Sequence, residues 1–178
     1  MRVERTFAFL DLCGFTRYTE LHGDDAAVAV LAQLRAVLRA VSEQRGVRIT
    51  KWLGDGAMLS GIDAQAVIGC AVEVRDRVAA GSPLPLRGGI ARGPVIMFEG
   101  DDYVGAAANL AARLCRAASA NRLLAAADVL DDLAAPGVVA RHLRDIVVDG
   151  IDGAVPVVEL LSGGEPEGAV AGIVRRLR

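Results

Sequence analysis

Two aspartates stand where a metal site for a phosphorylated ligand could form. Asp11 closes an apolar run at 6–10 that predicts a buried strand, and Gly14 follows it. A glycine lets the chain turn sharply there, which leaves backbone amides free to approach an anion. Asp55 lies between two glycines at the expected tip of a β-hairpin. Mg²⁺ prefers a few carboxylates together with phosphate oxygens, so the two aspartates could share such a site, although each also fits an ordinary polar turn.

A third segment carries an acid, an amide and an arginine. Asp102 precedes Gly105, where a helix of small residues over 105–118 is expected to begin. Asn109 and Arg113 are four residues apart and therefore share one face of that helix. The arginine could offer a planar fork of donors to a phosphate. The alternative interpretation is a solvated helix face.

The elements that would position these residues alternate between strands and helices, with hairpins among them. The segment 47–61 predicts a strand, a tight turn and a second strand, and it has no room for the crossover that a parallel pair needs. The pattern therefore predicts an α+β fold with helices packed on a mixed or antiparallel sheet. Helices are expected at 24–45, 63–80, 105–118 and 128–134, and strands at 6–10, 47–52, 57–61, 86–91, 95–98, 123–125, 138–148 and 155–161, with Gly93 and Pro94 separating two of them.

The composition is that of a folded globular chain. Of 178 residues, 53% are hydrophobic and 24% are charged, which is far from a disordered composition. The net charge of −2 argues against nucleic acid as a partner. The cysteines Cys13, Cys70 and Cys115 have no metal-ligand spacing and indicate a reducing, cytoplasmic environment. We expect neither a signal peptide nor a membrane span, because no long apolar stretch occurs.

Taken together, the three segments resemble the signatures of the catalytic domain of class III nucleotidyl cyclases, of the bacterial adenylyl cyclase type. The matching stretches are Phe9 to Thr16, Leu53 to Gly56 and Asp102 to Leu114, in this order. The resemblance extends from residue 6 to about residue 161. It implies a ferredoxin-like βαββαβ core with additional strands and helices, and we expect a catalytic domain at 1–162. The glycine-containing stretch 163–168 predicts a flexible C-terminal tail at 163–178.

The resemblance implies which residues contact metal and phosphate. Asp11 and Asp55 match the residues that hold two Mg²⁺ or Mn²⁺ ions, and the backbone carbonyl of Leu12 would complete one of the two metal sites. The β- and γ-phosphates of the nucleotide would lie on the turn that is formed by Cys13, Gly14, Phe15 and Thr16.

Lys51 and Asp102 match the pair that reads the purine in adenylyl cyclases, and Lys51 is the only lysine in the chain. Adenine presents an acceptor at N1 and a donor amine at N6, which suit a lysine and a carboxylate respectively. Guanine reverses both groups, and mismatched buried polar groups cost roughly 1–3 kcal/mol each, so ATP is favoured over GTP. The resemblance further implies that Asn109 orients the ribose and that Arg113 stabilises the transition state.

In the resembling family each active site is shared between two subunits of a head-to-tail homodimer. Asp11 and Asp55 would serve one site, and the residues that contact the base, the ribose and the transition state would serve the other. Two departures bear on this. Asp152 stands where a basic residue that contacts the triphosphate is usual, with Arg92 as one candidate substitute. The hairpin arm at 93–102 is several residues short, which predicts a monomer or a weak dimer that closes when ATP and metal bind.

The sequence therefore predicts an adenylyl cyclase that converts ATP to 3′,5′-cyclic AMP and pyrophosphate by a two-metal mechanism. Two alternatives stay open, namely a catalytically weak or inactive nucleotide-binding module and a guanylyl or mixed purine cyclase. The six matching side chains favour catalysis, whereas Asp152 and the short arm argue against rapid turnover. No catalytic role is expected for His22 or His142, and Trp52 is expected to pack rather than to stack on a base.

Overall fold

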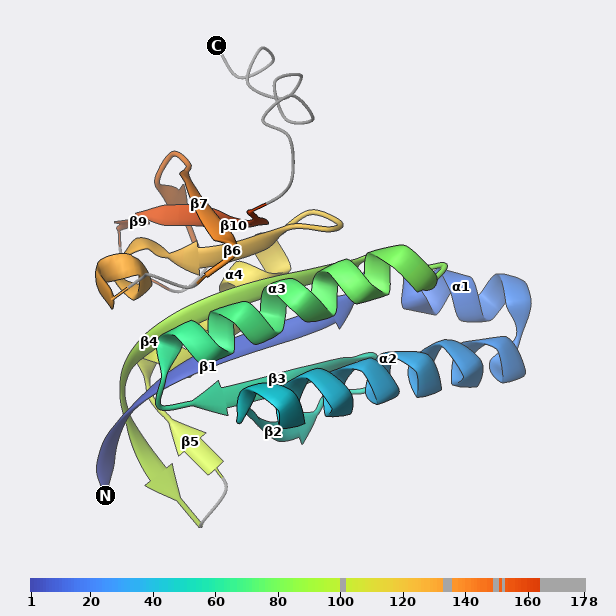
Figure 1. Ribbon diagram of the computed structural model, residues 1–178, viewed down its shortest axis with the longest axis horizontal. Coiled ribbons are helices and arrows are strands. Elements are labelled where there is room, and N and C mark those ends of the chain that lie inside the picture. The colour runs from blue at the N-terminus through green and yellow to red at the C-terminus, as the bar shows by residue number, and fades with distance from the viewer. Residues whose placement is uncertain (100–101, 133–135, 149–150, 152, 164–178) are drawn as a thin grey trace.

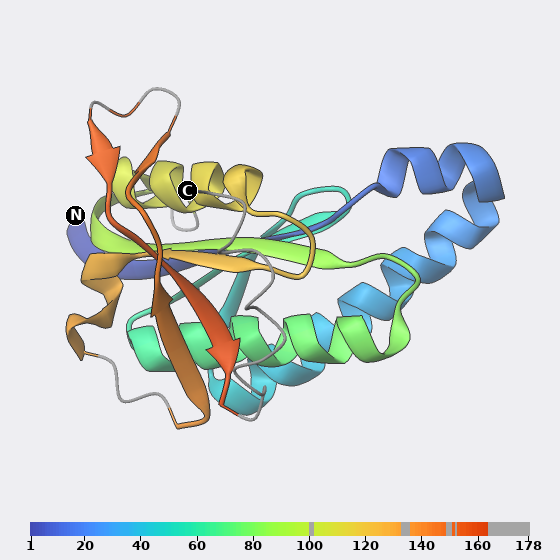
Figure 2. The ribbon, with the colours of Figure 1, turned by 90° about the horizontal axis from the view of Figure 1, so that it is seen from above.

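The computed structural model describes residues 1–99, 102–132, 136–148, 151 and 153–163. One large sheet runs through the described part of the molecule, with helices on both faces (Figure 1, Figure 2). No helix in these ranges is long and apolar enough to cross a membrane. The elements follow one another along the chain as β1 (Arg2–Leu12), α1 (Phe15–His22), α2 (Asp24–Arg45), β2 (Arg48–Trp52), β3 (Gly56–Gly61), α3 (Ala64–Gly81), β4 (Leu86–Phe98), β5 (Asp102–Val104), α4 (Ala106–Ala117), β6 (Leu123–Ala126), the 3₁₀ helix η1 (Ala127–Asp132), β7 (Val138–His142), β8 (Ile146–Val147), β9 (Ala154–Val155) and β10 (Val157–Ser162).

The first half of the chain forms a ferredoxin-like core. Strands β4, β1, β3 and β2 lie side by side in that order, and each neighbouring pair is antiparallel. Helices α2 and α3 connect β1 to β2 and β3 to β4, and both pack on one face of the sheet (Figure 2). This βαββαβ arrangement, extended by further strands and helices, confirms the fold class expected from the sequence.

The two helices on this face follow their sequence signals closely. Helix α2 has the predicted bounds, and its buried apolar residues recur at three- or four-residue steps, as in Val30, Leu34, Leu38 and Val41. Helix α3 begins where the side chain of Asp63 accepts a hydrogen bond from the Gln65 amide at 2.9 Å. Both helices therefore turn a continuous apolar stripe toward the sheet.

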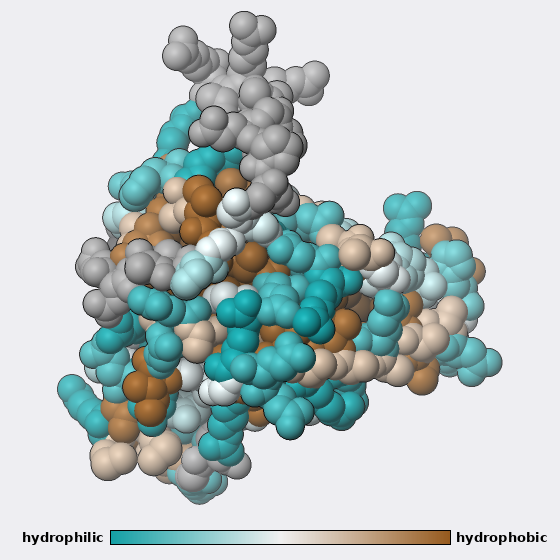
Figure 3. Space-filling model, in the orientation of Figure 1, coloured by the Kyte–Doolittle hydropathy of each residue, from teal (hydrophilic) through white to brown (hydrophobic). Residues whose placement is uncertain are grey.

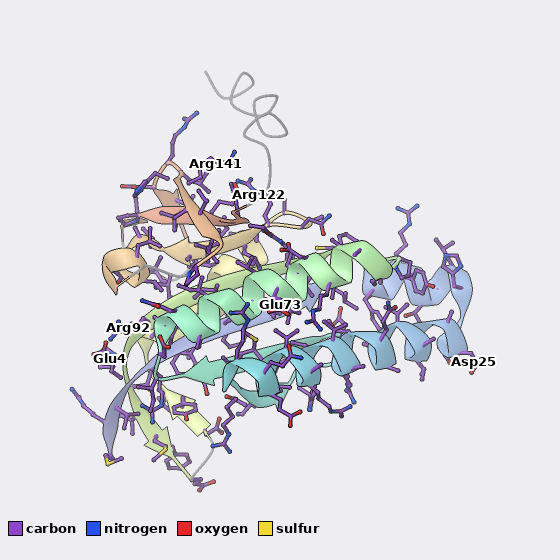
Figure 4. All side chains as sticks on the ribbon, in the orientation of Figure 1. Glu4, Asp25, Glu73, Arg92, Arg122 and Arg141 are labelled. Carbon is purple, nitrogen blue, oxygen red and sulfur yellow. The ribbon has the colours of Figure 1, made fainter. Side chains whose placement is uncertain are left out.

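The outer surface of the α2–α3 layer is charged. Nε of Arg45 on α2 donates to the Glu73 carboxylate on α3 at 2.8 Å, and Arg77 pairs with the same carboxylate at 2.6 Å. Hydrophilic side chains gather over this layer in Figure 3, and Glu73 lies at its centre in Figure 4. Such partly exposed pairs contribute little stability, so this surface serves mainly to keep the helix layer in water.

Helix α4 covers the opposite face of the sheet (Figure 2). A Cβ atom added at Gly89 of β4 would collide with the backbone of α4 at Ala111 and Cys115, so the helix lies directly on this glycine. Gly89 pairs with Phe9 of β1. Side chains alternate between the faces along a strand and share a face across a pair. Phe9 and Asp11 therefore lie on the side of the sheet that α4 covers.

Strand β4 is continuous, in contrast to the two strands predicted on either side of Gly93 and Pro94. Pro94 pairs with Glu4 of β1, although a proline has no N–H to donate to a sheet. On its other side β4 pairs with β6 only at 88–90 and with β5 only from Ile96 onward. No described strand therefore needs the donor that Pro94 lacks.

The sequence pattern does not predict helix α1. With eight residues it is shorter than the window of about 11–18 residues over which helical periodicity is recognised. It begins directly after Gly14, whose φ of 80° lies in the left-handed region that glycine adopts without strain. The residues expected to form a phosphate-binding turn are thus the start of a helix.

The second half of the chain extends the sheet beyond β4. Strand β6 runs parallel to β4, and β10 and β7 follow it. Glu159 of β10 is buried and forms ion pairs with Arg122 and Arg141 on either side (Figure 4). The predicted strand 138–148 is divided into β7 and β8, and β8 pairs with β9 in a small second sheet. Residues 164–178 lie outside the described ranges, so the domain boundary after residue 162 stays a prediction.

Candidate active site

Asp11 and Asp55 meet where β1 ends beside the β2–β3 hairpin. Asp11 pairs with Gly56 of β3, and the amide of Leu12 donates to the Asp55 carbonyl at 3.2 Å. A Cβ atom at position 56 would collide with the carbonyl of Leu10 and would lie 3.2 Å from Oδ1 of Asp11. Glycine is therefore needed at this position, because the hairpin has to approach β1 closely to bring Asp55 beside Asp11.

The two carboxylates repel each other. The pKa of Asp55 is raised, first by burial and then by the negative charge of Asp11. A bound cation would remove this repulsion, and carboxylate oxygens are ligands that suit Mg²⁺ and Mn²⁺. The donor set therefore fits divalent ions whose coordination is completed by oxygens of a ligand. Leu12 could contribute only its backbone carbonyl, because its hydrocarbon side chain has no atom that can bind a metal ion.

Arg87 belongs to this site, although the sequence did not indicate it. It stands opposite Asp11 in the β1–β4 pairing, and its Nε and Nη2 donate to Oδ2 of Asp11 at 3.0 and 2.8 Å. These bonds raise the pKa of the guanidinium. The only signal in the sequence was one charged residue within the apolar strand 86–91, and a charge in a strand does not reveal its partner.

The start of α1 lies at the same end of the sheet. The amide of Cys13 donates to the loop before β4 at 2.8 Å, which anchors the turn. The amide of Tyr18 donates to the Gly14 carbonyl at 3.0 Å as the first bond of the helix. The amides of Phe15 and Thr16 therefore precede the helical ladder, and amides in this position attract anions. Burial raises the pKa of the Cys13 thiol, which keeps it uncharged at neutral pH.

Lys51 and Asp102 form an ion pair between β2 and β5, although 51 residues separate them in the sequence. Their side chains are 43% and 50% exposed. Lys51 and Trp52 are neighbours in a strand and therefore point to opposite faces of the sheet. The Trp52 ring lies 4.9 and 5.4 Å from the guanidinium carbons of Arg35 and Arg39 on α2. Trp52 thus packs against the helix layer, as predicted.

Asn109 and Arg113 lie on α4, and Asn109 is exposed. The buried residues of this helix are those that face the sheet, namely Ala107, Ala108, Ala111, Leu114 and Cys115. Within the described part of the chain, the Arg113 side chain forms no hydrogen bond or ion pair. The polar groups of the pair are therefore available to a ligand or to a second chain.

A cavity of about 330 Å³ opens beside Asp11. Residues of β1 and β4 line it together with Leu53 from the hairpin, and Cys115 and Arg116 come from the end of α4. Burial raises the pKa of Cys115 to about 12, so this thiol stays protonated and lines the cavity as an uncharged side chain. Arg87 also lines the cavity, and its Nη1 donates to the backbone carbonyl of Arg116 at 3.4 Å.

The structure divides the predicted site residues into two groups. The first, which we call the carboxylate group, comprises Asp11, Leu12, Cys13, Gly14, Phe15, Thr16 and Asp55. The second, which we call the base group, comprises Lys51, Asp102, Asn109 and Arg113. None of the base group is among the described residues that line the cavity beside Asp11. Of the carboxylate group, Asp11 lines this cavity, and the β2–β3 hairpin holds Asp55 beside it.

Arg92 does not lie beside the carboxylates. It pairs with Glu4, with 2.7 Å between Nε and Oε1, and both are labelled in Figure 4. Arg92 and Arg87 are five residues apart in one strand, so they point to opposite faces and stand roughly 16 Å apart along the strand. Arg87 is thus the better placed of the two for a ligand at Asp11. Asp152 lies outside the described residues.

The chain matches no family model. Among curated proteins it is similar to Uncharacterized protein Rv2212 of Mycobacterium tuberculosis and to Uncharacterized protein Mb2235 of Mycobacterium bovis, each 33% identical over 153 residues. These residues make up 85% of this chain and 40% of each relative. The chain therefore spans less than half the length of the curated relatives that it matches.

Three similar solved structures are nucleotide cyclases. The adenylyl cyclase CyaB from P. aeruginosa is 24% identical with a TM-score of 0.76, over 91% of this chain and 95% of that one. The guanylyl cyclase Cya2 is 26% identical with a TM-score of 0.77, over 94% and 96%. The guanylate cyclase domain of RhGC from Catenaria anguillulae in complex with GTP is 18% identical with a TM-score of 0.80, over 91% and 98%. The chain therefore has the fold of class III adenylyl and guanylyl cyclase catalytic domains.

Proposed function

We propose that the chain is an adenylyl cyclase that converts ATP to 3′,5′-cyclic AMP and pyrophosphate with two Mg²⁺ or Mn²⁺ ions. The observation that carries the proposal is the pair of carboxylates, Asp11 and Asp55, beside an arginine-lined cavity on this fold. The reaction joins the 3′-hydroxyl to the α-phosphorus of the same nucleotide and releases pyrophosphate. The protein therefore has to position these atoms and to stabilise the charge that develops on them.

Asp11 and Asp55 would hold the metal ions. Two divalent ions at these carboxylates would lower the pKa of the attacking hydroxyl and neutralise the leaving pyrophosphate. Burial and then the negative charge of Asp11 raise the pKa of Asp55, and a bound cation would offset both effects by favouring the ionised carboxylate. The backbone at 12–14 and the free amides of Phe15 and Thr16 would receive the ion-bound phosphates.

Arg87 would change its partner when the nucleotide binds. In the free chain it donates two hydrogen bonds to Oδ2 of Asp11. Once that carboxylate coordinates a divalent ion, it has less negative charge to offer, while the arriving phosphates bring more. Arg87 would then hold the triphosphate, a role for which the carboxylate of Asp152 is unsuited.

Lys51 and Asp102 would select the base. Lys51 can donate to N1 of adenine, and Asp102 can accept from the N6 amine. Their contact in the free chain supports this role, because it brings the two groups together from distant segments. An exposed ion pair of this kind contributes only about 0–1 kcal/mol, so the base can displace it at low cost.

Asn109 and Arg113 would act on a nucleotide whose metal ions belong to a second chain. A head-to-tail homodimer would place the base group of each chain against the cavity of the other, which creates two equivalent sites. Exposed apolar side chains on the β4–β5 arm offer a surface for this pairing, namely Ile96, Phe98 and Val104 at 43%, 53% and 59% exposure. Because the predicted arm is short, the dimer would be weak and would be strengthened by nucleotide.

Guanylyl or mixed purine specificity is the second candidate. A guanylyl cyclase has the highest sequence identity of the three similar structures named above. The pairing of Lys51 with Asp102 favours adenine, since guanine would set its O6 acceptor against the carboxylate. Base selection is therefore the part of the proposal that a direct comparison of the two nucleotides has to decide.

Product analysis of the purified protein with Mn²⁺ and either ATP or GTP tests the proposal. We expect mainly cyclic AMP, with Asp11→Ala as the inactive control. Cyclic GMP as the main product would identify a guanylyl cyclase. Nucleotide binding without any cyclic product at high protein concentration would identify a binding module and would reject the enzyme.

Mixing inactive variants tests the shared site. Asp11→Ala and Arg113→Ala should each be inactive alone, and their mixture should regain part of the activity because one complete site can form. Sedimentation at several protein concentrations, with and without an ATP analogue that cannot cyclise, should detect a dimer that nucleotide strengthens. A tight dimer at nanomolar protein without nucleotide would contradict the weak association.

A further inference from the structure

A second arginine, Arg116, lines the cavity that contains Asp11 and Arg87. It lies in the last turn of α4 and is exposed. Within the described part of the chain its side chain forms no ion pair. Its backbone carbonyl accepts the hydrogen bond from Arg87 at 3.4 Å, which fixes this end of the helix beside the carboxylate group. Arg116 is thus a cation at the rim of the cavity whose charge no described carboxylate neutralises.

Arg116 and Arg113 are separated by one turn of α4, yet they differ in the surface they reach. Arg116 lines the cavity beside its own chain's Asp11, and Arg113 is not among the described residues that do so. The proposed function assigns Arg113 to a nucleotide on the partner chain. The same helix therefore offers a cation to each of the two sites of a dimer.

With metal ions bound, the charged groups near the cavity would carry one positive charge fewer than is needed to neutralise a nucleoside triphosphate. Asp11 and Asp55 are negative and Arg87 is positive, so with two divalent ions the site would carry three net positive charges. A fully ionised nucleoside triphosphate carries about four negative charges. Arg116 would complete the balance, and matched charge in a partly enclosed site favours both binding and rapid association.

We propose that Arg116 binds the terminal phosphates of the nucleotide whose metal ions are held by its own chain. The inference rests on the proposed function, because it assumes a nucleoside triphosphate at Asp11 and Asp55. Arg116 would supply the positive charge that contacts the triphosphate, a contact for which the carboxylate of Asp152 is unsuited. Helix α4 would then serve two sites at once, with Arg116 acting within the chain and Arg113 acting across the interface.

Binding of 3′-deoxy-ATP in the presence of Mn²⁺ tests this contact without turnover, because the analogue lacks the attacking hydroxyl. Arg116→Ala should weaken binding roughly tenfold, the lower end for one charge-assisted contact, and Arg116→Lys should recover part of the affinity. Binding of 3′-deoxy-AMP, which lacks the terminal phosphates, should not change. Arg77→Ala removes the same charge from the α2–α3 surface and should bind as the wild type does.

Mixtures of variants test which site Arg116 serves, with activity measured at ATP well below KM. Arg116→Glu mixed with Arg113→Ala retains one complete site, so activity should rise above the sum of the two variants. Arg116→Glu mixed with Asp11→Ala retains none, so activity should equal that sum. The reverse pattern would place Arg116 on the partner's nucleotide and would overturn the proposal.

The outcomes separate this inference from the proposed function. A wild type that binds 3′-deoxy-ATP, together with an Arg116→Ala variant of equal affinity, overturns the role of Arg116 alone. A wild type that does not bind the analogue overturns both. Thermal melting should be the same for the wild type and the Arg116 variants, because the side chain is exposed.

Discussion

The carboxylate group and the base group are built in different ways. The carboxylate group lies where β1, β3 and the start of α1 meet, and backbone hydrogen bonds such as that from Leu12 to Asp55 hold it in place. The base group lies on β2, β5 and α4, where Lys51, Asp102 and Asn109 are exposed and Arg113 is partly buried. Lys51 and Asp102 pair with each other.

The two groups differ in whether they need a second chain to bind their part of the nucleotide. Burial and, after it, the negative charge of Asp11 raise the pKa of Asp55, so the two carboxylates already lie near each other within one chain. Lys51 and Asp102 already neutralise each other, and a second surface is needed to enclose a base against them. Under the proposed function, one folded chain would offer two carboxylates for metal ions and an exposed pair for the base, and substitutions should affect the two groups differently.

The largest effect is expected from Asp55→Asn, which breaks the carboxylate group. Losing one of two metal ligands should lower kcat/KM by at least about 10³-fold, since metal contacts supply several kcal/mol of transition-state stabilisation. Steady-state cyclase assays with Mn²⁺ and ATP measure this loss. Substantial residual activity would contradict the assignment of Asp55 as a metal ligand.

The same variant should be more stable than the wild type without metal. A raised carboxyl pKa contributes stability below the ordinary pKa of aspartate, and this contribution is lost as pH rises through the raised value. At neutral pH the ionised Asp55 is therefore unfavourable, and a neutral amide should raise the melting temperature by about 1–3 °C. A lower melting temperature would show that the ionised carboxylate of Asp55 does not destabilise the folded chain.

Arg87→Met should lower kcat/KM by roughly 10²-fold, as expected for loss of a charge-assisted contact to the triphosphate. It should also leave Asp11 without its two hydrogen bonds from Arg87, so Mn²⁺ affinity without nucleotide should rise or stay equal while nucleotide affinity falls. Titrations of the metal and of 3′-deoxy-ATP separate the two effects. Equal loss of both affinities would indicate a structural role instead.

Metal binding should weaken as the solution becomes more acidic. Protons compete for Asp55 at a higher pH than for an ordinary aspartate, because its pKa is raised. Below the raised value the apparent Mn²⁺ affinity should fall by up to about tenfold per pH unit. Fluorescence or calorimetric titrations at several pH values measure this slope, and the dependence should be much weaker in Asp55→Asn.

Lys51→Ala tests the base group and should have a smaller effect. The preference for ATP over GTP should fall by roughly tenfold, the loss of one well-placed polar contact, with little change in Mn²⁺ affinity. Because the pair with Asp102 is half exposed, the free energy of unfolding should change by less than about 1 kcal/mol. An unchanged preference would remove Lys51 from base selection.

Arg92→Met is expected to have the smallest effect and is the matched control for Arg87→Met. It removes the same side chain from the same strand, but from the opposite face, where its partner is Glu4. Activity should stay within about twofold of the wild type, because the partly exposed ion pair with Glu4 lies on the face of β4 opposite to Asp11. A large loss of activity would contradict the assignment of the nucleotide to the face of β4 that carries Arg87.

Several features of the fold were predictable because their signals are local. Helix α2 has the predicted bounds because its apolar residues repeat along one face and Gly46 follows its end. The β2–β3 hairpin follows from a short segment with glycines at its turn. Helix α1 was missed because its eight residues are too few for a helical repeat to stand out in the sequence. Strand β4 was divided in the prediction because the missing N–H of Pro94 is harmless only where it would point away from β1, to a side on which no described strand pairs with this residue.

The sequence by itself determined the types of group that the site offers, namely two carboxylates, a lysine, an amide and an arginine, and the local elements that carry them. Only the tertiary structure decided which of these groups meet. Arg87 stands opposite Asp11 because of the β1–β4 register, and Arg92 is excluded because residues five apart in a strand point to opposite faces. Lys51 meets Asp102 only because β5, which pairs with β4, brings Asp102 within reach of the Lys51 side chain on β2. Contacts between distant segments depend on register and packing, which no short stretch of sequence encodes.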